Sequence, residues 1–364
     1  MIIFTRARAA SENVLCVIAT RDTAEAYQAD ARAYQYRHAA DLLPGEHWYY
    51  EDFRLSVQDV GYFTDPAEPP TDPYFVLLSA EGDVYHFSDA GRYQERIEGA
   101  GTAAPDSKSH GKTLNIGQIG GRLYASGGGG QIYVRAGRND WRLLTDALLF
   151  DMDAYLEAGD EGPDFDDPDY VQWTLDFVSS AVARNVSFYG HEGLAEDAIY
   201  LCGTVGPGTK PVLAYWDGTT LEELPVPLSE AALTGIHIEH EDSVWVCGRE
   251  GVLLHGSRAR GFNPVPGDRR LNLFHHITSY RGRLVMPASV RPGGLWQQDP
   301  KTGAFGHFEP RLPPLTKPPA DRGEPHGGPF FAQAIGDVLW VVAPRDIFRF
   351  DGTAWERIEH PDVP

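Results

Sequence analysis

Short runs of apolar residues recur along nearly the whole chain, each joined by a brief polar or glycine-bearing turn to another run. In the clearest stretch, 120–144, Leu123 and Ala125 alternate with Tyr124 and Ser126 before a series of four glycines. Residues that alternate in this way lie on opposite faces of a β-strand, and glycine allows the positive φ that a tight turn needs. The pattern predicts antiparallel strands joined by short turns.

Seven runs of this kind define a repeat of four strands. The run taken as the second strand of each repeat lies at 14–19, 75–79, 122–126, 198–202, 243–247, 283–287 and 338–342. A small, mildly apolar strand precedes it, and a third and fourth strand follow. The turn between those last two is Asp217-Gly218 in one repeat and Asp351-Gly352 in another, which is a strong hairpin signal.

Four strands repeated at roughly 40–50 residues are the pattern of a β-propeller. We therefore predict an all-β fold, a seven-bladed β-propeller of four-stranded antiparallel blades that occupies residues 1–364 as a single domain. The first repeat is degenerate. Its third and fourth strands are predicted at 24–27 and 32–37, but the alanine-rich segment 23–41 is also compatible with a helix. That alternative gives six blades with an N-terminal cap.

Several local motifs are similar to those of known propellers. They are Gly121-Arg122-Leu123-Tyr124, Trp216-Asp217-Gly218, and Phe350-Asp351-Gly352 with Trp355. With them the chain resembles the β-propeller superfamily in its Kelch-like and sialidase-repeat-like branches. It lacks a combined Gly-His and Trp-Asp signature that recurs from repeat to repeat, as it does in WD40 proteins. It also lacks a glycine doublet in every blade and the Ser-x-Asp-x-Gly-x-x-Trp box of sialidases. The resemblance therefore implies the fold and transfers no catalytic residue.

The longest gap between repeats predicts an acidic insertion at 151–184, between the third and fourth blades. Residues 151–170 hold nine carboxylates and no Lys or Arg, and 171–181 is compatible with a helix that places Trp173, Phe177 and Ala181 on one stripe. Long loops on a rigid scaffold are common functional sites. The candidate protein-binding residues are Asp153, Glu157, Asp160, Glu161, Asp164, Asp166, Asp167 and Asp169. A solvated loop is the alternative, and the spacing does not match an EF-hand.

The overall charge limits the classes of partner. The chain has 31 Lys and Arg against 52 Asp and Glu, a formal net charge of -21. Such a balance argues against nucleic acid or an anionic membrane as partner, because phosphate binding depends on basic residues. A basic protein partner is compatible with it, as is ordinary solubility. Three cysteines without metal-ligand spacing, and no long apolar run or signal peptide, indicate a reduced, cytoplasmic protein.

One ionisable cluster is expected near the axis of the propeller. His237 and Glu239 alternate on one leading strand, and His276 is expected on the next, so a channel metal held by these three residues is one hypothesis. Histidines satisfied by ordinary hydrogen bonds are the alternative. Aromatic residues at 48–50 and Trp296 are further candidate interface anchors, and packing between blades is the alternative that we favour for them.

Two functional hypotheses follow from these patterns. Because no Walker loop, nucleophile elbow or zinc-protease motif is present, we favour a non-enzymatic protein-binding propeller without a cofactor. A bacterial immunity protein that neutralises a basic toxin or effector domain is a concrete form of it. The alternative is a metal-dependent hydrolase or lyase with its site in the central channel.

Overall fold

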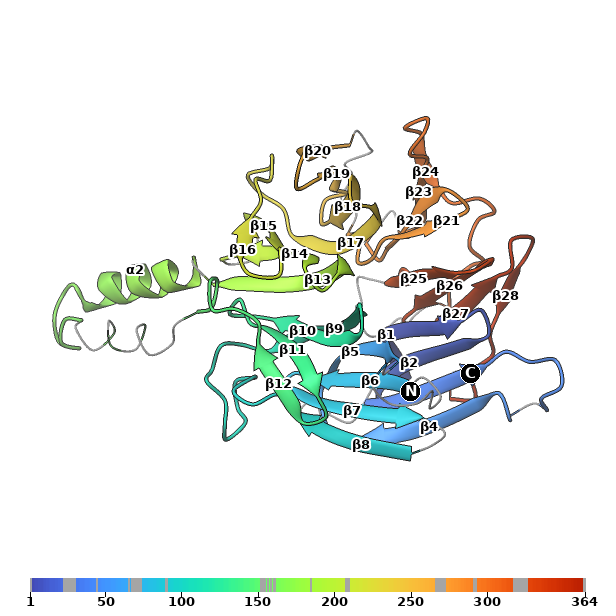
Figure 1. Cartoon of the computed structure of the whole chain (residues 1–364), viewed down its shortest axis with the longest axis horizontal. Coiled ribbons are helices and arrows are strands. Elements are labelled where there is room, and N and C mark those ends of the chain that lie inside the picture. The colour runs from blue at the N-terminus through green and yellow to red at the C-terminus, as the bar shows by residue number, and fades with distance from the viewer. Residues whose placement is uncertain are drawn as a thin grey trace.

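Seven four-stranded antiparallel sheets are arranged around a common axis (Figure 1). The structure is a computed structural model and describes residues 2–21, 31–43, 45–64, 66, 74–88, 91–150, 155, 157, 159, 162–183, 185–206, 210–265, 273–290, 293–316 and 327–362. In every sheet the strands follow one another in chain order, and the first strand lies nearest the axis. The protein is therefore a seven-bladed β-propeller, as the repeats predict.

The first four blades and the insertion come from residues 2–223. Blade 1 contains β1 (Ile2–Ser11), β2 (Val14–Arg21), β3 (Ala31–Arg37) and β4 (Trp48–Phe53). Blade 2 contains β5 (Val57–Phe63), β6 (Tyr74–Ser79), β7 (Asp83–Ser88) and β8 (Gly91–Arg96). Blade 3 contains β9 (Thr113–Ile119), β10 (Arg122–Gly127), β11 (Ile132–Gly137) and β12 (Asp140–Leu143). The helix α2 (Tyr170–Val182) precedes blade 4, which contains β13 (Val186–Ala195), β14 (Ala198–Val205), β15 (Lys210–Trp216) and β16 (Leu221–Glu223).

The last three blades complete the ring. Blade 5 contains β17 (Leu233–His240), β18 (Ser243–Gly248), β19 (Leu253–Ser257) and β20 (Gly261–Pro264). Blade 6 contains β21 (Thr278–Tyr280), β22 (Arg283–Ala288), β23 (Gly294–Gln298) and β24 (Phe305–His307). Blade 7 contains β25 (Phe331–Ile335), β26 (Val338–Ala343), β27 (Asp346–Phe350) and β28 (Trp355–Arg357).

The apolar runs are second strands that are buried on both faces. In β26, Val338, Trp340 and Val342 pack against blade 1, whereas Leu339 and Val341 pack against blade 6. Because successive side chains of a strand point to opposite faces, a strand between two blades must be apolar at every position. Each neighbouring pair of blades shares one apolar cluster of this kind, seven clusters in all among the described residues.

The turn chemistry also agrees with the prediction. In both Asp-Gly turns the glycine has a φ of 93°. One Oδ of Asp217 accepts the backbone N–H of Thr219 at 3.0 Å and of Thr220 at 2.8 Å. The carboxylate thus replaces backbone partners at the turn while glycine adopts the conformation that L side chains disfavour. These turns fix the register between the third and fourth strands.

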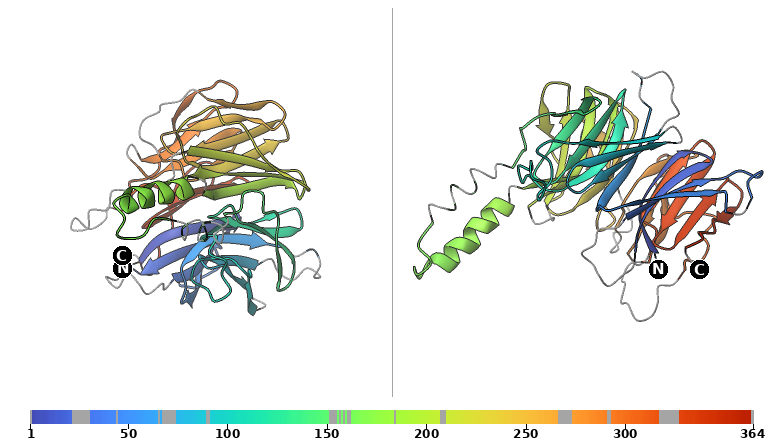
Figure 2. Two further views of the ribbon diagram at one scale, coloured as in Figure 1. Left: turned by 90° about the vertical axis from the view of Figure 1, so that its left-hand side faces the viewer. Right: turned by 90° about the horizontal axis from the view of Figure 1, so that it is seen from below.

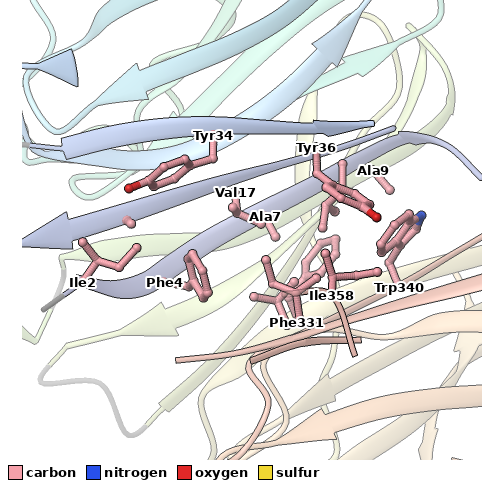
Figure 3. Packing of buried hydrophobic residues seen from close by; sticks show 14 of the residues in the cluster. Ile2, Phe4, Ala7, Ala9, Val17, Tyr34, Tyr36, Phe331, Trp340 and Ile358 are labelled. Atoms are coloured by element: carbon pink, nitrogen blue, oxygen red, sulfur yellow. The ribbon is translucent and has the colours of Figure 1, made fainter. Parts of the chain in front are cut away.

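The ring closes between blades 1 and 7, which are built wholly from opposite ends of the chain. Figure 3 shows their shared cluster, with Phe4, Tyr36, Trp340 and Ile358 among its residues. Hydrogen bonds join the blades as well: the Trp340 indole N–H donates to the carbonyl of Ser11 at 3.2 Å. Among the described strands, none passes from one of these sheets into the other, so closure depends on packing between complete blades.

The first blade corrects the predicted positions of its outer strands. Its third strand is β3, at the place predicted for the fourth, and its fourth is β4, which the prediction missed. Residues 24–27, predicted as the third strand, lie outside the described part of the chain. The outer strand has the sequence Trp-Tyr-Tyr-Glu-Asp-Phe, and its burial is irregular, so the alternation that marks other strands is weak there. The six-blade alternative is excluded, because blade 1 is a complete four-stranded sheet.

Candidate functional site

The insertion between blades 3 and 4 projects from the ring as the helix α2 (Figures 1 and 2). One face of the helix is aromatic: the rings of Trp173 and Phe177 stack with their centroids 5.0 Å apart. The ring of Tyr155 in turn stacks on Phe177 at 4.6 Å. The predicted helix and two residues of its predicted stripe are confirmed, whereas the side chain of the third, Ala181, is outside the described part.

Both ends of the insertion are attached to the glycine turn between β10 and β11. The carbonyl of Gly129 accepts the N–H of Phe150 at 2.8 Å, and the N–H of Gly130 donates to the carbonyl of Val186 at 2.9 Å. A Cβ at Gly129 would lie 1.8 Å from the carbonyl oxygen of His110, which explains the need for glycine there. Sequence reasoning recognised this run as a turn but missed that it holds the base of the insertion.

The described candidate carboxylates of the insertion are all exposed. They are Glu157, Asp164, Asp166, Asp167 and Asp169, and the structure describes no ion pair for any of them. The other three candidates, Asp153, Asp160 and Glu161, lie outside the described residues. Across 151–183 the chain has ten carboxylates and no Lys, Arg or His. The segment therefore carries a negative charge that its own residues leave uncompensated.

Two of these acidic residues, Asp167 and Asp169, form hydrogen bonds at the start of the helix. The carbonyl of Asp169 accepts the N–H of Trp173 at 2.9 Å, so Asp169 is the N-cap residue of α2. One Oδ of Asp167 accepts the N–H of Asp169 at 2.8 Å. Acidic residues are favourable at this end because the free N–H groups and the helix dipole are positive there. Part of the acidity thus has a local structural role.

Around the axis, a side chain from the inner part of each blade binds the backbone of the next blade. The bonds join Arg6 to Gln58, Asp59 to Ile116, Asn115 to Phe188, Glu192 to Ile238, Thr234 to Phe274, His276 to Ala332, and Gln333 to Ala9. This ring of seven axial links uses a different residue type at every step, which explains why no motif in the sequence revealed it. We refer to it below as the axial links.

Two of the three candidate metal ligands, His276 and Glu239, are engaged in separate hydrogen bonds. His276 lies on the segment before β21, not on the strand itself as predicted. Its Nδ1 lies 2.7 Å from the carbonyl oxygen of Ala332. A carboxylate oxygen of Glu239 accepts the hydroxyl of Ser243 at 2.7 Å and the indole N–H of Trp245 at 3.1 Å. Burial lowers the pKa of His276 to about 4 and also lowers the pKa of His237. Within the described ranges no three His, Cys, Asp or Glu residues are grouped to hold a metal ion.

One serine–histidine pair superficially resembles a catalytic arrangement. The hydroxyl of Ser243 lies 2.9 Å from Nε2 of His255, and the same hydroxyl donates to Glu239. In a hydrolase triad the carboxylate instead orients the histidine through its other ring nitrogen. Here the carboxylate binds the serine, and the His255 ring stacks on Trp245 at 3.9 Å. The geometry is that of a satisfied polar cluster and supplies no activated nucleophile.

The remaining sequence candidates divide between surface and core. Tyr49 and Tyr50 are exposed on the outer strand of blade 1, whereas Trp296 is buried between blades 5 and 6, as the alternative of packing between blades predicts. Trp296 stacks on Phe305 and His307 at the outer strand of its own blade, so its position at a blade edge does not expose it. All three cysteines are free and buried. No helix in the described part of the chain is long and apolar enough to cross a membrane.

Comparison with solved structures agrees with the class that the blades define, the β-propellers. The chain is similar to YCF48 from Cyanidioschyzon merolae, with a TM-score of 0.57, 12% identity, and coverage of 94% of this chain and 93% of that one. It is also similar to the WD40 β-propeller domain of Doa1, with a TM-score of 0.56, 7% identity, and coverage of 95% and 91%. These likenesses concern the fold alone.

A more specific similarity is found among characterised proteins. The chain is 24% identical over 284 residues to the protein named Immune protein Tsi7 of Pseudomonas aeruginosa, covering 78% of this chain and 75% of that relative. No family model matches the chain.

Proposed function

We propose that this propeller is an immunity protein that binds and neutralises a toxic effector protein in the cytoplasm, without catalysis. The observation that carries the proposal is the similarity to Immune protein Tsi7 over 78% of the chain. A rigid ring with a projecting loop is also a common architecture for protein recognition.

The acidic insertion is the surface that we assign to the effector. Its described carboxylates are exposed, and the segment 151–183 contains no basic residue. A partner with a basic surface would be attracted by this charge, which accelerates association and disfavours acidic partners. The proposed partner is therefore a basic protein domain, and neither nucleic acid nor an anionic membrane fits the charge.

A growth assay tests the function. The effector to use is the product of the reading frame beside the gene for this chain, expressed alone and together with the chain. Relief of growth arrest on co-expression is the expected result. Persistent arrest despite soluble expression of the propeller would refute the proposal.

A charge variant tests the assigned surface. In it Asp164, Asp166, Asp167 and Asp169 are replaced by Asn, which keeps an acceptor oxygen at the start of α2. The matched control neutralises four exposed propeller carboxylates, Asp41, Glu98, Glu230 and Glu241. We expect weaker protection and slower association from the insertion variant alone. Equal effects of the two variants would show that overall charge, and not the insertion, matters.

A further inference from the structure

The outer face of α2 carries an uncovered apolar stripe. Val171, Leu175 and Val178 are 67%, 59% and 43% exposed, and their spacing places them on one side of the helix. Just before the helix, Phe165 is 81% exposed and touches only the edge of the Tyr170 ring among described aromatic contacts. Surface helices normally present polar residues on the side that faces water, so this stripe needs a reason.

The stripe is not what attaches the helix to the protein. The opposite face does so, through the stacked rings of Trp173 and Phe177 and the chain segment that passes beneath them. A Cβ at Gly162 would lie 2.3 Å from the Trp173 ring, which shows how closely that segment approaches. The helix therefore has two apolar faces, and only one of them is covered within the chain.

The surrounding charge selects among possible occupants. Ten carboxylates and no basic residue lie in 151–183, so a second copy of this chain would place two strongly acidic segments against each other. An anionic membrane would be repelled for the same reason. A protein groove with an apolar floor would cover the stripe, and Lys or Arg along its rim would pair with the carboxylates. An amphipathic helix commonly binds in such an apolar groove.

We infer that α2 enters an apolar, basic-rimmed groove on the effector, with Val171, Leu175 and Val178 as the anchors and the carboxylates as the rim. This inference rests on the proposed immunity function and names the part of the partner that is recognised. The three anchors span about 10 Å of helix, at 1.5 Å per residue. Phe165 extends the same contact beyond the start of the helix.

The test replaces the three anchors by Gln, which keeps helix propensity and adds no charge. The control is Leu194→Gln, an exposed leucine (49%) near the end of β13 that is remote from the insertion. The probe is the purified effector from the reading frame beside this gene, made catalytically inactive. We expect at least about 30-fold weaker binding for the anchor variant and unchanged binding for the control, since central apolar anchors dominate helix recognition. Circular dichroism and the unfolding midpoint should be unchanged for both variants.

Other results of this experiment would distinguish a failure of the groove inference from a failure of the proposed immunity function. If the wild-type chain binds and protects while the anchor variant binds equally well, the groove inference is wrong and the immunity function stands. If the wild-type chain neither binds nor protects, both are wrong. If sedimentation shows a wild-type dimer that the anchor substitutions dissociate, a second copy covers the stripe and the inference is overturned.

Discussion

The propeller ring and the insertion use apolar side chains in opposite ways. In the ring, each second strand is covered on both faces, as in β26, where Trp340 packs toward blade 1 and Leu339 toward blade 6. In α2, Trp173 and Phe177 cover one face while Leu175 remains exposed on the other. We therefore expect the ring to carry the stability of the protein, whereas recognition by the insertion is our proposal. If both hold, changes in one should leave the other intact.

The largest expected effect is at the interface that closes the ring. Trp340 is fully buried among residues of blades 1 and 7, and its indole N–H is bonded to Ser11. Trp340→Ala should lower the free energy of unfolding by about 4 kcal/mol, the usual cost of deleting a large buried aromatic side chain. Equilibrium unfolding in urea measures this change in the free energy of unfolding. A loss below about 1 kcal/mol would show that closure contributes little.

A buried ion pair between blades 2 and 3 should have the next largest effect. Glu95 accepts hydrogen bonds from Arg135 at 2.8 Å and from the Trp141 indole at 2.8 Å. Burial raises the pKa of Glu95, but the neighbouring His86, at 3.4 Å, and the hydrogen-bonded Arg135 outweigh burial and lower the pKa to about 2. Glu95→Gln should cost about 3 kcal/mol, because it removes the charge that faces the buried guanidinium.

The exposed pair Asp140–Arg142 offers a control for this prediction, since Arg142 Nη2 lies 2.7 Å from Asp140 but both side chains face solvent. Asp140→Asn should leave the unfolding midpoint unchanged. A similar loss in the two variants would mean that burial does not distinguish these pairs.

The axial links predict a pH effect at Glu192. Burial raises the pKa of Glu192 from 4.5 to about 7, although the N–H of Ile238 and the charge of Arg8 act against it. Between about pH 4.5 and 7 the unfolded chain loses this proton while the folded chain keeps it, so stability falls as the pH rises through that range. Glu192→Gln removes this dependence.

Unfolding measured from pH 4 to pH 8 checks this prediction. The stability of Glu192→Gln relative to the wild-type protein should increase steadily up to about pH 7 and then level off. A difference that stays constant with pH would show that Glu192 is ionised in the folded protein.

The smallest expected effect on stability is in the insertion. Trp173→Ala removes the ring that stacks on Phe177, so α2 should open more often and its amide hydrogens should exchange faster. The free energy of global unfolding should change by less than about 0.5 kcal/mol, because no shared blade cluster contains this residue. A clear loss of global stability would contradict the division between ring and insertion.

The sequence predicted the ring well because the blade pattern is local. Runs such as 338–342 are apolar at every position since both faces are buried, and Asp-Gly turns mark the hairpins. The outer strands of blade 1 were misplaced because alternation is weak in β4. The axial links could not be predicted, since residues as different as Asp59, Asn115 and His276 do equivalent work across gaps of 50 residues or more in the chain.

The candidate site was predicted in part. Charge located the insertion and the helical stripe located the inner face of α2, because both are visible in a single segment. The exposed face at Val171 and Leu175 was missed, since periodicity alone does not tell which of two apolar faces a neighbouring segment covers. The role of Gly129 at the base of the insertion depends on residues brought together only by the fold.

Closure without strand exchange also has a mechanical consequence. The two ends of the described chain lie close together in both views of Figure 2, at the interface between blades 1 and 7. The last described residues also contact blade 1, where the Tyr34 hydroxyl donates to Asp362 at 2.5 Å. A force applied to the two ends would load that interface first, and there it meets side-chain packing and scattered hydrogen bonds rather than a shared β-ladder. We expect the ring to open at this interface before the individual blades unfold.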